Sequence, residues 1–173
     1  MADEKIVGNR VYLRKLSLDD ASEEYCRWLN DPEVNKYLET REATIEDLKA
    51  YIKMKRESKD TLFMGIFLKE NDKHIGNLKL EPIDFEEKKA TFSILLGDKN
   101  EWGKGIGSEA TELIVRYAFN ELGLNKVDLG VISENTKAIR SYEKVGFKII
   151  GRVPKCLDHD GIKYDKIIME ITK

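Results

Sequence analysis

The residues best suited to bind a ligand form a glycine-rich stretch near the middle of the chain. Three glycines alternate with other residues in the stretch 103–107, between an apolar run at 91–96 that predicts a strand and an amphipathic pattern at 106–122 that predicts a helix. Glycine lets the backbone pass close to a ligand, and the first turn of a helix offers unpaired N–H groups at the positive end of its dipole. The junction therefore predicts an anion site, most simply for a phosphate, to which Lys104 adds a positive charge.

The order of residues in this stretch excludes two common phosphate motifs. A Walker A loop requires Ser or Thr directly after its Lys, whereas Lys104 is followed by Gly105. A dinucleotide-binding fingerprint requires G-x-G-x-x-G early in a βαβ unit, and here G-x-G-x-G follows about a hundred residues of other sequence. Taken alone, the stretch is equally consistent with a flexible turn between a strand and a helix.

The composition is typical of a soluble globular chain and limits the classes of partner. Of 173 residues, 36% are charged and 41% are hydrophobic, and a net charge of −2 gives no bulk attraction to nucleic acid. No apolar run approaches the roughly 18–20 residues of a membrane helix, and Cys26 and Cys156 suggest neither a disulfide framework nor a metal site. We expect one domain over residues 1–173, cytoplasmic, without a metal, nucleic acid or membrane partner.

Hydrophobic periodicity predicts the elements that position the glycine-rich stretch. Strands are expected at 7–16, 61–68, 73–83, 89–96, 126–132, 147–153 and 162–171. Helices are expected after the N-cap residues Ser17, Thr44 and Asn135 and directly after the glycine-rich stretch. On the helix at 106–122, Glu109 is expected to face solvent.

The order of these elements predicts the fold class. The short connections between 61 and 96 predict three consecutive antiparallel strands, and the strand–helix–strand unit over 91–132 requires a right-handed parallel crossover. We therefore expect an α+β (mixed α/β) fold, in which a central mixed, mostly antiparallel sheet carries helices on both faces.

Two segments together resemble the GNAT superfamily of acetyl-CoA-dependent N-acetyltransferases. The family pattern [Q/R]-x-x-G-x-[G/A] falls on 102–107, and the pattern N-x-x-[A]-x-x-x-Y-x-x-x-G-F falls on 135–147. Trp102 stands where the superfamily usually has Gln or Arg. With Gly-Lys-Gly after it, this segment looks like the ribosomal-protein alanine acetyltransferase (RimJ/RimL-like) branch, whose members acetylate protein N-termini, polyamines or amino sugars. The element order matches as well, so the resemblance covers essentially the whole chain and implies the acyl-CoA N-acyltransferase (GNAT) fold.

The resemblance implies direct transfer of acetyl from acetyl-CoA to a primary amine in a ternary complex, without a covalent enzyme intermediate. It implies that the pyrophosphate of coenzyme A lies on the backbone N–H groups of 103–108 and that Tyr142 protonates the departing thiolate. It also implies that the pantetheine arm of coenzyme A pairs with the backbone of Leu95 and Leu96 and with the side chain of Asn135. The residues that the resemblance assigns to coenzyme A are Leu95, Leu96, Trp102, Gly103, Lys104, Gly105, Ile106, Gly107, Ser108 and Asn135.

Several of these residues also have a purely structural interpretation. Tyr142 lies on the apolar face of its predicted helix, where a tyrosine is usually a core residue, and Asn135 is a satisfactory N-cap without any ligand. No general base can be identified: Glu81 and Ser93 are candidates by location only. A protein α-amine with a pKa of about 8 is partly neutral near pH 7, so a water chain could serve as the base.

The remaining histidines and cysteines carry no predicted role. His74 and His159 are isolated in polar surroundings, and Cys156 has no histidine placed to activate it as an acyl carrier. We therefore expect no catalytic part for these side chains.

The partner is expected to be a small-molecule or peptide amine, bound by a monomer or homodimer. The alternative is a sensor that binds acyl-CoA without turnover, although Tyr142 favours catalysis because a sensor needs no thiol acid. Ten acidic and three basic residues give the stretch 17–47 a net charge of −7. This charge either reflects helix caps and solvated surface or steers a cationic amine inward, with Tyr37 and Glu39 closest to it.

Overall fold

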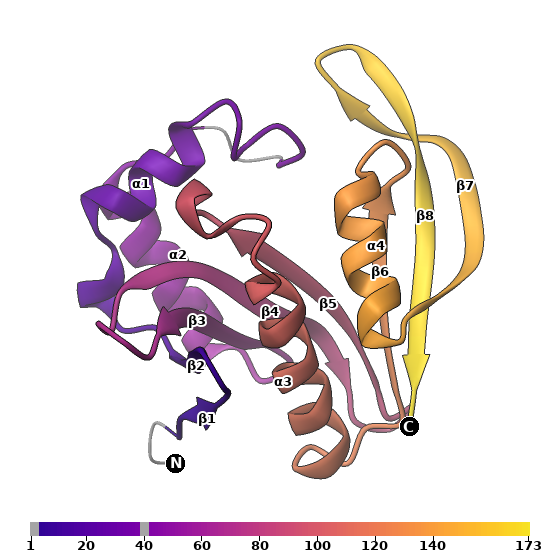
Figure 1. The fold of residues 1–173 in the computed structure, drawn as a ribbon, viewed down its shortest axis with the longest axis horizontal. Coiled ribbons are helices and arrows are strands. Elements are labelled where there is room, and N and C mark those ends of the chain that lie inside the picture. Colours follow the sequence, from indigo (N-terminus) through magenta and orange to yellow (C-terminus); the bar gives the residue numbers. More distant parts are fainter. Residues whose placement is uncertain (1–3, 39–41) are drawn as a thin grey trace.

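The computed structural model describes residues 4–38 and 42–173, which form one eight-stranded sheet flanked by helices (Figure 1). The strand order across the sheet is β1-β2-β3-β4-β5-β6-β8-β7. The strands are β1 (Ile6–Val7), β2 (Val11–Lys15), β3 (Leu62–Leu68), β4 (His74–Asp84), β5 (Lys89–Leu96), β6 (Lys126–Ile132), β7 (Lys148–His159) and β8 (Ile162–Thr172). The helices are α1 (Glu23–Asn30), α2 (Ile45–Glu57), α3 (Ile106–Asn120) and α4 (Thr136–Val145), and the 3₁₀ turns are η1 (Leu18–Asp20) and η2 (Lys99–Glu101).

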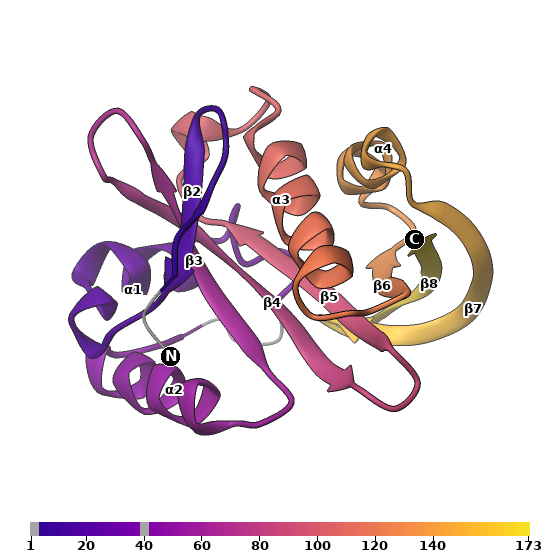
Figure 2. The same ribbon diagram turned by 90° about the horizontal axis from the view of Figure 1, so that it is seen from below.

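The sheet is mixed and mostly antiparallel, as predicted. Every neighbouring pair of strands is antiparallel except β5 and β6. The three-stranded antiparallel unit β3–β4–β5 and the parallel crossover through α3 are both confirmed. Figure 2 shows α1 and α2 on one face of the sheet and α3 and α4 on the other, so the expected fold class is confirmed.

The parallel strands β5 and β6 pair only near their first residues. Residues 89–91 of β5 pair with residues 126–128 of β6, and the pairing stops there. At the last pair, Thr91 Oγ1 donates a hydrogen bond of 2.6 Å to Asp128 Oδ1. Beyond this bond the two strands diverge (Figure 1), and residues 92–96 of β5 have no strand partner on that side.

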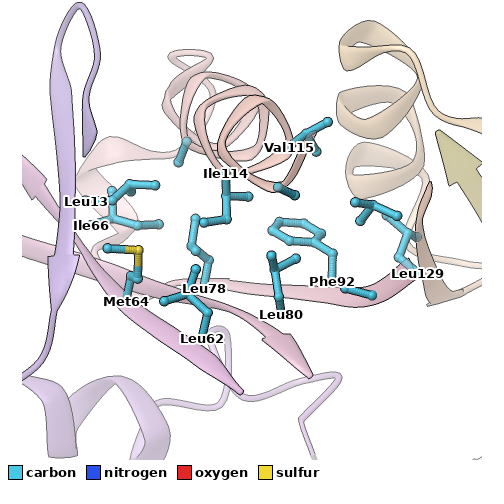
Figure 3. Packing of buried hydrophobic residues seen from close by; sticks show 14 of the residues in the cluster. Leu13, Leu62, Met64, Ile66, Leu78, Leu80, Phe92, Ile114, Val115 and Leu129 are labelled. Carbon is cyan, nitrogen blue, oxygen red and sulfur yellow. The ribbon is translucent and has the colours of Figure 1, made fainter. Parts of the chain in front are cut away.

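Each face of the sheet has its own hydrophobic core. Figure 3 shows Ile114 and Val115 of α3 packed onto side chains that rise from β2 to β6, including Leu78 and Phe92. The other core lies under α1 and α2. Because the two cores are separated by the sheet, the central strands present one set of residues to α3 and the alternate set to α2.

The first predicted strand and the first predicted helix are each broken into two pieces. A turn in which Gly8 N donates to Val11 O at 2.8 Å divides the expected strand 7–16 into β1 and β2. The expected helix at Ser17 is only the single turn η1, although its capping box with Asp20 is present. The α-helix begins later because the Ser22 side chain accepts the Tyr25 N–H at 3.1 Å and so caps a second start.

The other helices begin where predicted, and α3 ends at Asn120, two residues before the expected 122. Thr44 caps α2 in a capping box with Asp47, and the backbone of Gly123 after α3 has a φ of +69°. Strand β7 is longer than the predicted 147–153, because irregular pairing after Val153 lets it continue beside β8. No helix in the described part of the chain is long and apolar enough to span a membrane.

Candidate active site

The glycine-rich stretch forms an open loop at the N-terminus of α3. Gly103 and Gly105 have φ angles of +74° and +78°, in the left-handed region that favours glycine. No atom lies within 4 Å of the position that a Cβ would take at Gly103 or Gly107. The loop backbone is therefore free to approach a ligand.

The loop presents a row of free hydrogen-bond donors. Within the described residues, no hydrogen bond is donated by the backbone N–H groups of residues 103–108. Gly105 is the N-cap residue of α3 and has no side chain to cap it. Free N–H groups at the positive end of a 15-residue helix form an anion site. This geometry fits the pyrophosphate that the sequence resemblance implies.

Positive side chains surround this loop. Arg10 Nη2 and Lys144 Nζ lie 3.5 Å and 3.8 Å from the position of a Cβ at Gly105. Lys104 Nζ forms an exposed ion pair of 3.4 Å with Glu101. The loop thus combines backbone donors with three nearby cations, which supports binding of a highly charged anion.

Glu109 ties the N-terminal hairpin to the loop and does not face solvent, so that prediction is wrong. Its Oε2 accepts from the backbone N–H groups of Arg10 and Val11, each at 3.0 Å, and its Oε1 lies 3.3 Å from Arg10 Nε. Arg10 Nη1 in turn donates to the Lys104 carbonyl at 2.6 Å. Glu109 and Arg10 therefore hold the loop from the side of β2. The sequence offered no signal for this contact because the partners are 99 residues apart.

Trp102 turns away from the loop backbone and back to β5. Its Nε1 donates a hydrogen bond of 2.8 Å to the Leu96 carbonyl, while the residue remains 40% exposed. Leu96 packs against the α3 core and Leu95 against the α2 core. The backbone of both residues lies on the part of β5 that β6 does not cover. Trp102 thus fixes the end of the strand edge on which a pantetheine arm is expected.

Asn135 lies at the N-terminus of α4, and Ser108 lies where α3 approaches the second half of that helix. Asn135 Oδ1 accepts the Ala138 N–H at 3.4 Å, so the predicted N-cap is confirmed, and its amide nitrogen makes no hydrogen bond to a described residue. Ser108 Oγ on α3 lies 2.8 Å from Ser141 Oγ on α4. The capping role of Asn135 therefore leaves its donor available to a ligand.

Tyr142 lies on α4 and faces β5 at the diverging strands. Its ring packs edge-on to Phe92 of β5 at 6.1 Å and tilted to Phe147 at 5.9 Å. Burial raises the pKa of Tyr142 to about 12. The hydroxyl makes no hydrogen bond within the part of the chain that the structure describes. Tyr142 is thus both a packed residue and a protonated, unengaged donor.

A cavity of about 650 Å³, here called the sheet–α2 cavity, opens on the opposite face of β5. Its walls come from α1, α2, the chain between them, and strands β3, β4 and β5. The lining residues are Tyr25, Leu29, Tyr37, Leu38, Glu42, Ala43, Asp47, Leu48, Tyr51, Lys55, Phe63, Asn77, Leu78, Lys79, Ser93, Ile94 and Leu95. Leu95 therefore belongs both to this cavity and to the strand edge beside β6.

The two candidate bases lie differently with respect to the sheet–α2 cavity. Ser93 lines it, whereas Glu81 does not. Glu81 forms ion pairs with Lys55 and, at 3.1 Å, with Lys79. Burial raises the pKa of Glu81, but the two ammonium groups lower it by more, so the pKa of Glu81 lies below its usual value. A carboxylate held between two lysines is a weak base.

Most acidic residues described in the stretch 17–47 already have partners. Asp20 pairs with Arg14 at 2.8 Å, Asp31 pairs with Lys99 at 2.7 Å, and Asp47 caps α2. Tyr37, expected to lie close to the amine, lines the sheet–α2 cavity, and Glu39 lies outside the described residues. The excess of acids is therefore largely explained by helix caps and ion pairs.

Of the residues without a predicted role, Cys156 lies outside the site and His74 lies beside it. Cys156 is exposed and unpaired, and the residues with described positions contain no group of three or more His, Cys, Asp and Glu that could hold a metal ion. His74 is half-buried, and its Nε2 lies 2.7 Å from Oδ1 of the cavity residue Asn77. Its neighbours on the sequence gave no sign of this burial.

Comparison with known proteins gives a consistent result. A family model described as an acetyltransferase (GNAT) domain matches residues 10–148. The uncharacterized N-acetyltransferase p20 of Bacillus licheniformis is 34% identical over 150 residues, which cover 84% of this chain and 83% of that protein.

Solved structures share the whole fold. An acetyltransferase of the GNAT family from Bacillus anthracis superposes with a TM-score of 0.86 at 24% identity over 98% of both chains. The spermidine N-acetyltransferase of Vibrio cholerae, in complex with CoA and spermine, has a TM-score of 0.86 at 23% identity and covers 95% of this chain and 96% of its own. At these identities the likeness establishes the fold, and the expected acyl-CoA N-acyltransferase fold is confirmed.

Proposed function

The chain belongs to the GNAT acetyltransferase family and is an N-acetyltransferase, and we propose that it transfers acetyl from acetyl-CoA directly to a primary amine in a ternary complex. The observation that carries this proposal is the arrangement on the two faces of β5. The anion-binding loop and Tyr142 lie on the α3 side of the diverging strands, and the sheet–α2 cavity opens on the other side. Two substrates can therefore meet at one strand edge.

The loop and the strand edge are proposed to bind acetyl-CoA. The free N–H groups of residues 103–108 and the nearby Arg10 and Lys144 suit its pyrophosphate. The uncovered backbone of Leu95 and Leu96 suits the amide groups of the pantetheine arm, with Asn135 as a further donor. A backbone N–H at this edge would also stabilise the oxyanion that forms when the amine attacks.

Tyr142 is proposed to protonate the leaving thiolate. A thiol with a pKa of about 8.5 leaves as a thiolate near neutral pH, and a positioned phenol can donate to it. With its pKa raised to about 12 by burial, Tyr142 keeps its proton until that moment. The acceptor amine loses its proton to water, because Glu81 is engaged by two lysines.

The acceptor is proposed to be a protein N-terminal α-amine, a polyamine or an amino sugar bound in the sheet–α2 cavity. The Trp102-Gly-Lys-Gly segment supports placing the chain in the RimJ/RimL-like branch. The single sheet that extends from β1 to β7 supports treating residues 1–173 as one acetyltransferase domain.

The experiment that tests the proposal is release of free thiol from acetyl-CoA in the presence of a panel of primary amines. We expect thiol release that depends on the amine, with one acetyl group found on the amine by mass spectrometry. Binding of coenzyme A without thiol release for any amine would instead indicate the alternative function, an acyl-CoA sensor.

A further inference from the structure

Asn77 places an unpaired amide nitrogen in the wall of the sheet–α2 cavity. Asn77 lies on β4 directly opposite Leu95 of β5, lines the cavity and is only 4% exposed. Its Nδ2 atom makes no hydrogen bond within 3.5 Å to a described residue. The Tyr25 hydroxyl faces this amide in the same cavity: burial raises the pKa of Tyr25, and the contact with Asn77 lowers it. Buried polar groups are nearly always paired, because an unpaired donor destabilises the fold. A buried unpaired donor in a cavity wall therefore points to a partner on the molecule that fills the cavity.

The side-chain oxygen of Asn77 is fixed by a half-buried histidine. His74 Nε2 lies 2.7 Å from Asn77 Oδ1, and because a carboxamide oxygen only accepts, His74 is the donor. The His74 ring stacks on Phe67 at 4.8 Å and meets Trp28 edge-on at 4.9 Å. This packing fixes the ring, and the hydrogen bond sets the amide with its oxygen toward His74 and its nitrogen unpaired.

The nearest charged group on the same wall is also a donor. Lys79 follows two residues later on β4, and its Nζ lies 3.0 Å from the Tyr51 hydroxyl and 3.1 Å from Glu81. Burial lowers the pKa of Lys79, but Tyr51 and Glu81 raise it above its usual value, so the side chain stays an ammonium. An amide N–H₂ and an ammonium on one wall favour an oxygen atom and disfavour another ammonium. Of the acidic lining residues, Glu42 precedes α2 and Asp47 lies in its first turn, so neither belongs to this wall.

We propose that Asn77 determines acceptor specificity by donating a hydrogen bond from Nδ2 to an oxygen of the acceptor amine. This inference rests on the N-acetyltransferase function proposed above. The acceptor is an amine that carries a carbonyl, carboxylate or hydroxyl oxygen close to the reacting nitrogen. A polyamine offers no such oxygen and brings additional ammonium groups toward Lys79, so polyamines are poor substrates. His74 is a positioning residue, because it holds the amide in the donating orientation.

The test compares four amines that share one side chain and differ in the oxygen-bearing group beside the nitrogen, together with one polyamine. Leucinamide, leucine and leucinol carry a carbonyl, a carboxylate and a hydroxyl oxygen, and 3-methylbutylamine has the same side chain without an oxygen; spermidine is the polyamine. kcat/KM is measured for each by thiol release. The variants are Asn77→Leu, which removes both polar atoms, and Asn77→Asp, which keeps an oxygen for His74 and replaces the donor with a second carboxylate oxygen, adding a negative charge. Asn120→Asp, at an exposed position on α3, is the matched control.

We expect the wild-type protein to prefer one of the three oxygen-bearing amines over 3-methylbutylamine. In both Asn77 variants the ratio of kcat/KM for that amine to kcat/KM for 3-methylbutylamine should fall by about tenfold or more. In Asn120→Asp this ratio should not change. Comparing the ratio between proteins cancels the different basicity of the amines. The amine with the largest loss identifies the oxygen as carbonyl, carboxylate or hydroxyl.

Two outcomes would overturn the inference: spermidine as the best acceptor, or equal losses for all five amines in Asn77→Asp. Calorimetric titration of leucinamide and 3-methylbutylamine into the complex of the protein with CoA gives the ratio of their affinities, which does not depend on turnover. If no amine releases thiol, the proposed function fails, and the calorimetric ratio still decides the role of Asn77. Thermal unfolding checks that each variant is folded. If Asn77→Leu does not fold, the test relies on Asn77→Asp.

Discussion

The two faces of β5 obtain their binding groups in different ways. On the α3 face, one continuous segment supplies six backbone N–H groups, residues 103–108, and its shape depends on two glycines with positive φ. On the α2 face, the sheet–α2 cavity gathers side chains from two helices, the chain between them and three strands. Backbone donors do not depend on side-chain identity, whereas the cavity changes with every lining residue.

This difference assigns separate roles to the two faces. We expect changes on the α3 face to alter the affinity for acetyl-CoA with little effect on the choice of amine. Changes in the cavity should alter the choice of amine with little effect on acetyl-CoA. Tyr142 lies at the junction of the two, where the strands diverge, and should affect the chemical step itself.

The largest effect is expected at this junction. Tyr142→Phe removes only the hydroxyl, so kcat should fall by about tenfold to a thousandfold, which is the contribution of one positioned acid. The affinity for acetyl-CoA, measured by calorimetry, should change little because the ring and its contacts with Phe92 and Phe147 remain. Wild-type turnover in this variant would show that Tyr142 is only a packing residue.

The ionisation of Tyr142 gives a matching pH profile. Because burial raises its pKa to about 12, the hydroxyl keeps its proton throughout the neutral and mildly alkaline range. kcat/KM should therefore rise with pH as the acceptor amine deprotonates, and it should not fall from loss of this proton below about pH 10. A descending limb near neutral pH that disappears in Tyr142→Phe would contradict the raised pKa.

The next largest effect is expected on the α3 face alone. Gly105→Asp places a carboxylate among the free N–H groups, so the affinity for coenzyme A should fall at least tenfold, or about 1.4 kcal/mol, in a calorimetric titration. Gly123→Asp is the control, because Gly123 has a similar φ of +69° at the other end of α3 and no nearby side chain. Equal affinities in the two variants would remove the loop from the coenzyme site.

A smaller effect is expected where the loop is held from β2. Glu109→Gln keeps the shape of the side chain but loses the charge that pairs with Arg10 and one of the two oxygens that accept hydrogen bonds. We expect KM for acetyl-CoA to rise about threefold to tenfold with kcat nearly unchanged, because the loop is loosened and the chemical groups are not.

Glu112→Gln is the matched control on the same helix. Glu112 is exposed, and among the described residues it pairs only with Arg116, one turn along α3 at 3.4 Å. A rise in KM of the same size in this variant would mean that charge on the surface of α3, and not the contact with β2, is responsible.

The smallest effect is expected from salt. The acids of the stretch 17–47 suggested steering of a cationic amine, but Asp20, Asp31 and Asp47 are engaged in ion pairs or a helix cap. We therefore expect kcat/KM for a basic peptide to fall by less than about threefold as ionic strength rises from low to physiological values. A steep fall, absent for an amine with a neutral tail, would instead support a negatively charged entrance.

The contrast between the faces also explains what the sequence could predict. The loop, the helix that follows it and the cap at Asn135 are local features, so residue types and spacing were enough to place them. The Arg10–Glu109 contact spans 99 residues, and nothing in the local pattern of either residue indicates it. The expected helix at Ser17 failed because two competing N-caps, Ser17 and Ser22, lie five residues apart.

The cavity could not be predicted for the same reason. Asn77 and Lys79 look like the polar side of an alternating strand, and only the packing of α1 and α2 over that face makes them cavity residues. The family resemblance supplied the reaction, and the acceptor side depends on contacts that only the folded chain brings together.

The most direct test of transfer across β5 is a measurement of initial rates with both substrates varied. Direct transfer in a ternary complex predicts reciprocal plots that intersect, and it predicts that the protein incubated with acetyl-CoA alone remains unmodified by mass spectrometry. Parallel reciprocal plots, together with an acetyl group recovered on a side chain such as the exposed Cys156, would contradict it and indicate a covalent intermediate.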